Sequence, residues 1–381
     1  MPFATVPSSS AFSEGVEVEV PFLDVGATYS ELGPALDEAY RRVMERGRFV
    51  LDEEVTSFES EFATAIGATG ARGVASGLDA LSLALRALGV QPGDEVIVPS
   101  FTFIATWLSV SAIGAVPIPA EPDERTAGLT VDSARRAVTS RTRAIVPVHL
   151  YGLPVDVAGF GDLAAESETM LVFDAAQAHG AHWQGSPIGA FGDACAWSFY
   201  PSKNLGAFGD GGAVSFTDNS IAERLESLRN YGSTEKYVHS QRGTNSRLDE
   251  LQAAFLRTKL PRLAEWNARR SSIAAEYLER LDALPISLPP VPEGRSSSWH
   301  LFVVRTERRN ELQQHLHESG VQTVVHYPIP PHRQQAYSDL RAGALPIADR
   351  LAGEVLSLPI GPHMTDGQVD HVVSAVSSFA W

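Results

Sequence analysis

The chain has a single cysteine, Cys195, so it cannot form an internal disulfide, and it contains no apolar run long enough to cross a membrane. Residues 1–15 are rich in serine and alanine but lack the basic residues and long apolar core of a signal peptide. We therefore expect a loose N-terminal tail rather than a targeting segment. Together these absences predict a cytoplasmic protein, because thiols stay reduced in that compartment.

Positive charge is also scarce, with 30 lysines and arginines against 46 aspartates and glutamates and a net charge of −16. No basic run offsets this balance, so we expect neither nucleic acid nor a membrane as a partner. The content of 44% apolar and 20% charged residues is typical of a globular protein that handles small molecules. A length of 381 residues exceeds what one core usually supports, which favours two domains. We expect no metal site.

One lysine lies in an unusual context, the stretch Ser198-Phe-Tyr-Pro-Ser-Lys-Asn-Leu-Gly-Ala-Phe-Gly-Asp-Gly-Gly212. The apolar run 194–199 before it predicts a short buried strand, and the glycines after it permit tight turns and close approach to a ligand. Lys203 is therefore expected at a strand end. A desolvated lysine loses its charge easily and becomes a nucleophile for a carbonyl. On this stretch alone, a surface lysine in a turn is the commoner explanation.

Apolar strands alternate with helical patterns through much of the chain. The predicted strands are 95–99, 143–148, 170–174 and 194–198, and the helices between them include 105–113 and 157–167. This alternation implies a mainly parallel sheet covered by helices on both faces, with ligands bound beyond the carboxyl ends of the strands. Asp174 and Ser198 end two predicted strands, and Phe103 and His149 follow two others. We expect one site at this edge.

The chain divides into three segments. We assign residues 1–15 to the tail, 16–265 to a large domain that begins with an extended arm, and 266–381 to a small α+β domain. Within the large domain, a helix is predicted over 33–46, and 230–247 is interpreted as a polar loop.

The side chains expected at the sheet edge match the needs of pyridoxal phosphate. This cofactor requires a lysine for covalent attachment and an acidic partner for its ring nitrogen, which Lys203 and Asp174 can supply. Phe103 can pack on the face of the ring, and Gln177 can donate to its phenolic oxygen. The combination, in this order along the chain, points to a pyridoxal-phosphate enzyme.

A phosphate site is indicated where a helix begins at Gly77. Free backbone N–H groups and the positive end of the helix dipole favour an anion there, so the amides of Gly77 and Leu78 and the hydroxyl of Ser198 can hold the cofactor phosphate. A capped core helix without a ligand explains this stretch about as well.

The chain resembles the DegT-type sugar aminotransferases, a branch of the fold-type-I pyridoxal-phosphate enzymes, from Pro21 onward. The motifs that carry the resemblance are Pro21-Phe-Leu-Asp24, Ser76-Gly-Leu-Asp-Ala-Leu81, Pro99-Ser-Phe-Thr-Phe103, His149-Leu-Tyr-Gly152, Asp174-Ala-Ala-Gln-Ala-His-Gly180, Ser198-Phe-Tyr-Pro-Ser-Lys-Asn204, Gly243-Thr-Asn-Ser-Arg-Leu-Asp249 and His326-Tyr-Pro328. The resemblance implies an α/β fold with a seven-stranded sheet in the large domain, a small C-terminal domain and a homodimer with active sites at the interface. It makes Lys203 the Schiff-base lysine, Asp174 the ring-nitrogen partner, Phe103 the stacking residue and Asn245 a phosphate contact from the other subunit.

Two stretches resemble a subgroup that aminates carbon 3 of nucleotide-linked keto sugars, namely Gly77-Leu-Asp-Ala-Leu81 and residues 230–239. Leu78 stands where many relatives have threonine, so only its backbone can contact a phosphate. The resemblance implies transfer of an amino group from L-glutamate to a dTDP-linked 3-keto-deoxyhexose in deoxyaminosugar biosynthesis. A 4-keto sugar or cyclitol aminotransferase and a non-catalytic, cofactor-binding regulatory protein are the alternatives.

Three side chains are candidates for recognising the sugar. Tyr200 precedes Lys203 by three positions, which brings its phenol within reach of the substrate side of the lysine. His326 and Tyr327 lie in an extended segment stiffened by Pro328-Ile-Pro-Pro, and they can supply polar rings to the cleft. Packing at the seam between the domains is the alternative role for these two.

Overall fold

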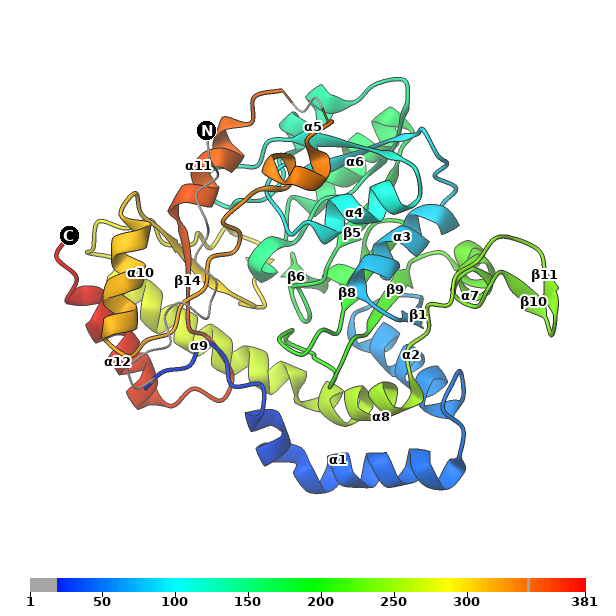
Figure 1. Cartoon of the computed structure of the whole chain (residues 1–381), viewed down its shortest axis with the longest axis horizontal. Helices are drawn as coiled ribbons and strands as arrows, with labels where there is room; N and C mark the ends of the chain where they lie inside the picture. Colours follow the sequence, from blue (N-terminus) through cyan, green and yellow to red (C-terminus); the bar gives the residue numbers. More distant parts are fainter. Residues whose placement is uncertain (1–18, 341–342) are drawn as a thin grey trace.

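A computed structural model describes residues 19–340 and 343–381, so the predicted tail at 1–15 lies outside the described residues (Figure 1). The described chain combines a large sheet covered by helices with a smaller α+β unit at one end (Figure 1). No helix within the described ranges is long and apolar enough to span a bilayer.

The large sheet has seven strands in the order β1-β9-β8-β5-β4-β2-β3. They are β1 (Gly70–Val74), β2 (Glu95–Pro99), β3 (Val116–Ala120), β4 (Thr142–Ile145), β5 (Met170–Asp174), β8 (Ala194–Ser198) and β9 (Gly212–Phe216). Only β9 runs antiparallel to its neighbours in this sheet. The predicted fold class, a mainly parallel seven-stranded sheet, is confirmed.

Helices cover both faces of the sheet, as the unbroken apolar strands require. One face packs against α2 (Glu53–Ala65), α5 (Val131–Ala137), α6 (Val157–Ser167) and α8 (Glu250–Lys259). The other packs against α3 (Gly77–Ala87), α4 (Ala105–Ala112) and α7 (Ala222–Arg229). In β5, Leu171 and Phe173 join the first layer and Val172 the second, because successive side chains of a strand point to opposite faces.

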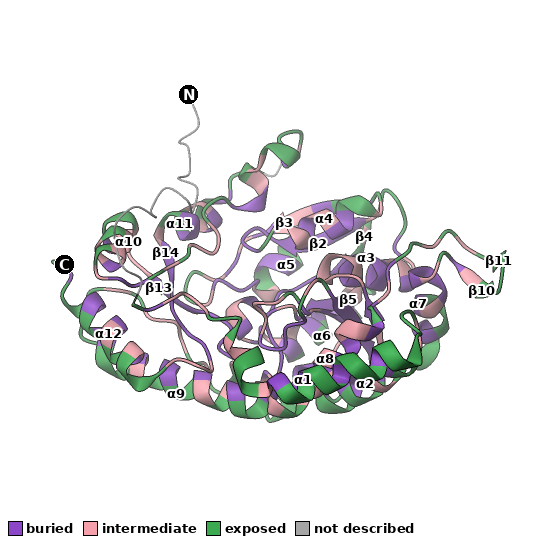
Figure 2. Cartoon of the chain, turned by 60° about the horizontal axis from the view of Figure 1, so that its bottom comes forward, coloured by how far each residue is buried: buried purple, intermediate pink, exposed green. Residues whose placement is uncertain are grey.

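Helix α1 (Ala27–Arg46) lies along α8, and its outward face is exposed (Figure 2). It begins six residues before the predicted start at Gly33, because Pro34 lies inside the helix instead of marking its first turn. The start is set by Asp24, whose Oδ1 accepts the backbone N–H groups of Gly26 and Ala27 at 2.9 and 3.1 Å.

Two further segments differ from the prediction. The sequence pattern gave no sign of β3, which contains Pro117 and Pro119 and lies at the edge of the sheet, where prolines are tolerated. The predicted polar loop 230–247 contains a hairpin of β10 (Ser233–Glu235) and β11 (Val238–His239) that projects beyond α7 (Figure 1). Its strands are too short and polar for an alternating apolar pattern to reveal them.

The smaller unit is built on an antiparallel pair, β13 (Phe302–Arg305) and β14 (Val355–Leu358). Its helices are α9 (Leu263–Leu281), α10 (Arg309–Glu318), α11 (Pro346–Glu354) and α12 (Asp366–Ser377). A separate small sheet consists of β12 (Arg295–Ser296), β6 (His182–Trp183) and β7 (Ser186–Pro187), and Trp183 of this sheet packs into the core of the large unit. Tyr277, Phe302 and Val372 are fully buried in the core of the smaller unit. The predicted boundary after residue 265 falls inside α9, and the division remains a prediction.

Candidate active site

The predicted site residues gather at the carboxyl edge of the parallel strands. Asp174 ends β5 and Ser198 ends the neighbouring β8, while Phe103 follows β2 and His149 follows β4. A bridge between Val148 and Asp174 extends the pairing of β4 and β5 to this edge. Adjacent parallel strands bring their carboxyl ends to one edge, as expected for a ligand site in an open α/β sheet. The side chain of His149 lies in the core instead, where its ring stacks on Phe173 at 4.8 Å and its Nδ1 accepts the backbone N–H of Val155.

Asp174 is a buried carboxylate held in one orientation. Its Oδ2 accepts a hydrogen bond from Thr106 Oγ1 at 2.9 Å, and its Oδ1 accepts one from the backbone N–H of Ala176 at 3.1 Å. Burial raises the pKa of Asp174, whereas these hydrogen bonds and the charge of Lys203 act in the opposite direction. The carboxylate therefore lies ready for a cationic or protonated partner.

Lys203 lies in the tight turn that follows β8. Its backbone N–H donates to Tyr200 O at 2.8 Å, and a Cβ on Gly206 would lie 2.4 Å from Pro201 O, so only glycine allows the chain to turn here. Burial lowers the pKa of Lys203 to about 8, against the attraction of Asp174. Near neutral pH, a far larger fraction of this amine is uncharged than of a solvated lysine.

The turn is anchored by residues that were not among the predicted site residues. Asn204 donates from Nδ2 to Asn267 Oδ1 and to Ser298 O, both at 2.8 Å, and its Oδ1 lies 3.1 Å from Nδ1 of His300. Burial holds the pKa of His300 well below its usual value, so its ring is neutral and donates from Nδ1. A fixed Asn204 also fixes the adjacent Lys203.

The start of α3 forms a cradle against the end of β8. A Cβ on Gly77 would lie 2.7 Å from Cβ of Ser198, and one on Gly212 would lie 2.4 Å from Ser76 O. Ser76 caps the helix by accepting the N–H of Asp79 at 3.1 Å, while the N–H groups of Gly77 and Leu78 have no partner within the described chain. These two free N–H groups at the start of a helix, together with the hydroxyl of Ser198, can donate hydrogen bonds to an anion.

Gln177, His326 and Tyr327 are brought together from the two parts of the chain. Gln177 Nε2 donates to Tyr327 Oη at 2.9 Å, and its Oε1 accepts the backbone N–H of Tyr151 at 2.6 Å. Nδ1 of His326 lies 2.8 Å from Oγ of Ser357, within hydrogen-bond distance. Gln177 thus engages Tyr327 in this structure, and its donation to a cofactor oxygen stays a prediction.

The remaining candidates are open to solvent. Phe103 is 53% exposed, with its ring centroid 5.4 Å from that of Tyr327, and Tyr200 is 55% exposed. Asn245 is also exposed, and no hydrogen bond joins its side chain to the site within the described residues. Its neighbour Ser246 donates to Asp79 Oδ2 at 2.8 Å, so the segment passes beside the start of α3.

These groups match pyridoxal phosphate in kind and number: an anion cradle, a buried carboxylate, an amine of lowered pKa and an open aromatic face. The fold gives the same answer, since the crystal structure of Streptomyces venezuelae DesV in complex with a ketimine intermediate superposes with a TM-score of 0.92. That chain is 53% identical, and the match covers 95% of this chain and 98% of the other. The fold and the site define a pyridoxal-phosphate-dependent aminotransferase of fold type I.

The family follows from the sequence comparisons. The model of the DegT/DnrJ/EryC1/StrS aminotransferase family matches residues 31–377. A dTDP-3-amino-3,4,6-trideoxy-alpha-D-glucose transaminase of Streptomyces venezuelae is 53% identical, covering 95% of this chain and 96% of its own. The erythromycin biosynthesis sensory transduction protein EryC1 of Saccharopolyspora erythraea is 52% identical, covering 95% and 100%. The chain belongs to the DegT/DnrJ/EryC1/StrS aminotransferase family.

The cradle at Gly77 generates a first prediction. In Gly77→Ala the new Cβ meets Ser198, so α3 must shift by a few tenths of an ångström, and we expect pyridoxal phosphate to bind about tenfold or more weakly, a typical effect of overpacking. Titration of the apoenzyme with the cofactor, followed by absorbance, measures this loss. Gly161→Ala in α6 is the matched control, because no atom lies within 4 Å of its Cβ position. If both variants bound pyridoxal phosphate with equal affinity, Gly77 would not be part of the phosphate site.

Proposed function

We propose that this enzyme transfers the amino group of L-glutamate to carbon 3 of a dTDP-linked 3-keto-deoxyhexose, a step of deoxyaminosugar and antibiotic biosynthesis. The observation that carries the proposal is the near full-length identity of 53% to a dTDP-3-amino-3,4,6-trideoxy-alpha-D-glucose transaminase, in a chain whose Lys203 and Asp174 are buried at one edge of the sheet. The acidic, disulfide-free composition supports a cytoplasmic location.

Eight residues hold the cofactor in this proposal, and each contributes a group of the right chemistry. They are Gly77, Leu78 and Ser198 for the phosphate, joined by Asn245 of the second subunit, with Asp174, Phe103, Gln177 and Lys203 around the ring. Pyridoxal phosphate, when bound, withdraws electrons from the reacting carbon and carries the amino group between the two substrates. Every other task falls to the chain's own side chains.

Lys203 is the proton carrier. With its pKa lowered to about 8, its Nζ has a substantial uncharged fraction near neutral pH and can accept a proton from the carbon of the amino donor. The same Nζ would deliver that proton to the cofactor carbon, and in the second half-reaction it would carry a proton from the cofactor carbon to carbon 3 of the sugar. The anchored turn around Asn204 keeps this atom in place during both transfers.

Asp174 keeps a proton on the ring nitrogen that it faces. Thr106 and the backbone of Ala176 hold its two oxygens, so no reorganisation is needed when charge develops in the ring. An ionised carboxylate in this buried place attracts a protonated nitrogen strongly, because little water screens the two charges.

The sugar is received by Tyr200, His326 and Tyr327 on the open side of the site. Burial and the nearby Lys203 lower the pKa of His326 to about 4, so its ring is neutral at physiological pH. Nδ1 is engaged by Ser357 Oγ, which leaves Nε2 for a sugar hydroxyl. The phenols of Tyr200 and Tyr327 add two further groups that can both donate and accept.

A panel assay tests the proposal. Purified holoenzyme is incubated with L-glutamate and, in separate reactions, a dTDP-3-keto-6-deoxyhexose, a dTDP-4-keto-6-deoxyhexose and a keto-cyclitol, and the amino products are quantified by mass spectrometry. We expect kcat/KM for the 3-keto sugar to exceed the others about tenfold or more. Lys203→Ala is the negative control, and circular dichroism shows whether it folds. A preference for the 4-keto sugar or the cyclitol would replace the proposed substrate with one of the alternatives.

The proposed sugar-binding residues Tyr200, His326 and Tyr327 lead to a prediction about the two half-reactions. Tyr327→Phe and His326→Gln each remove a group that faces the sugar, so we expect kcat/KM with the keto sugar to fall roughly 10-fold. The half-reaction with glutamate, followed as the loss of the cofactor's visible absorbance in single-turnover experiments, should change less than twofold, an estimate for a substrate that lacks the sugar hydroxyls. If the two half-reactions lost activity equally, His326 and Tyr327 would support the structure of the site without recognising the sugar.

We propose a homodimer whose two active sites each combine Lys203 of one subunit with Asn245 of the other. The exposed Asn245, beside a projecting hairpin, supports this arrangement.

A complementation experiment tests the shared sites. Lys203→Ala and Asn245→Glu should each be inactive, the second because a carboxylate would face the cofactor phosphate. Refolding an equal mixture should restore roughly a quarter of the parent activity, since half the dimers then carry one intact site. No recovery, with mixed dimers confirmed by mass spectrometry, would contradict shared sites.

A further inference from the structure

Tyr151 adopts an unusual backbone conformation beside the site, with φ 61° and ψ 5°. The left-handed backbone conformation is disfavoured for a residue with a side chain. Such a residue adopts it only where the surrounding structure holds the backbone in place. The next residue, Gly152, has φ 96°, and a Cβ there would lie 2.4 Å from Ser298 Oγ. The chain is therefore pressed against the small-domain side at this point.

Three hydrogen bonds connect Tyr151 to both parts of the molecule. Its N–H donates to Gln177 Oε1 at 2.6 Å, and its carbonyl accepts the N–H of Leu301 at 3.3 Å. Its phenol donates to the carbonyl of His326. Because Gln177 also donates to Tyr327 Oη, both members of the pair His326 and Tyr327 are tied to this one residue.

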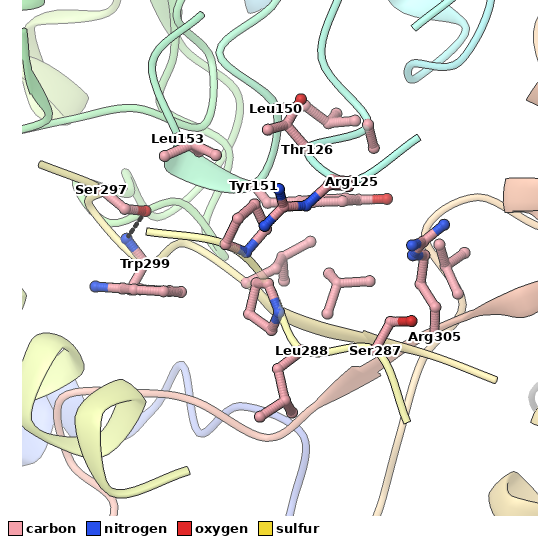
Figure 3. A pocket seen from close by; sticks show the side chains of 16 residues that line it. Arg125, Thr126, Leu150, Tyr151, Leu153, Ser287, Leu288, Ser297, Trp299 and Arg305 are labelled. Carbon is pink, nitrogen blue, oxygen red and sulfur yellow. Dashed lines mark hydrogen bonds between the residues drawn. The ribbon is translucent and has the colours of Figure 1, made fainter. Parts of the chain in front are cut away.

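A small cavity of about 40 Å³ borders Tyr151 (Figure 3). Trp299, Leu288, Arg125 and Arg305 line it together with Tyr151 (Figure 3). Tyr151 packs against a buried cluster that includes Leu150, Leu301 and Val303. The hydrogen bond of its phenol to the carbonyl of His326 adds to the contacts that Ser357 makes with this segment.

We propose that Tyr151 is a positioning residue for the keto-sugar half-reaction. It touches neither cofactor nor substrate, and acts by holding His326 and Tyr327 where they meet the sugar. The proposal rests on the proposed role of that pair. The glutamate half-reaction does not use the pair and so does not depend on Tyr151.

The first test is independent of the substrate. Tyr151→Phe removes the phenol oxygen and keeps the ring, and Tyr277→Phe is the matched control, because its buried phenol also donates to a carbonyl, Pro359 O at 2.9 Å, away from the site. Hydrogen exchange of the holoenzymes should be about fivefold faster or more over residues 324–329 in Tyr151→Phe alone. Unchanged exchange over that segment would overturn the proposal.

The second test is kinetic. In Tyr151→Phe we expect kcat/KM for the keto sugar to fall roughly 3- to 10-fold, as for a lost buried hydrogen bond, with the glutamate half-reaction unchanged within about twofold. The double variant with Tyr327→Phe should lose less than the product of the two single losses, because both act through one segment. Multiplicative losses, or equal losses in both half-reactions, would refute the positioning role.

The two proposals fail in different ways. If the parent enzyme aminates no dTDP-3-keto sugar, the proposed substrate is wrong, and the exchange experiment still decides whether Tyr151 holds the segment. If the parent aminates that sugar and Tyr151→Phe matches it in both tests, the function stands and the inference about Tyr151 is wrong.

Discussion

A buried carboxylate at the end of β5 and a largely buried amine after β8 form the electrostatic arrangement at the centre of the site. Burial raises the pKa of Asp174 and lowers that of Lys203, so for both groups desolvation outweighs their mutual attraction. Such a pair is costly to bury and is seldom retained for stability alone. It can exist here because β5 and β8 are adjacent strands of a sheet whose two apolar faces supply the stabilising free energy.

The histidines around Lys203 add no further charge to this arrangement. His179, His300 and His326 are buried around it, and burial together with the positive charge of the amine lowers the pKa of each ring. Three neutral imidazoles surround the lysine without competing for Asp174. The charges near Lys203 therefore come from Asp174 and from Asp24, Lys259 and Arg270, which line a pocket together with Lys203.

Sequence reasoning predicted the parts that depend on local pattern. The bounds of β5, β8 and α6 agree with their predicted ranges, because strands buried on both faces are continuous apolar runs and α6 has a clear period. The partners of Asn204 and Gln177 could not be predicted, since Ser298 and Tyr327 lie 94 and 150 residues further along the chain. Only the packing of the smaller unit against the sheet brings such pairs together, so both Gln177 and Tyr327 were predicted site residues but their hydrogen bond to each other was not.

Those unpredicted contacts share one location, the seam between the large sheet and the smaller unit. Asn204 reaches Ser298 and His300, and Gln177 reaches Tyr327, so the turn that carries Lys203 and the segment proposed to face the sugar are both positioned across the same seam. Asp174 and Ser198, by contrast, are held within the sheet. Asp174 and Ser198 thus depend on the sheet, whereas the turn of Lys203 and the segment of His326 and Tyr327 depend on the seam. Substitutions along the seam should therefore disturb that turn and that segment while leaving the hydrogen bonds of Asp174 to Thr106 and Ala176 intact.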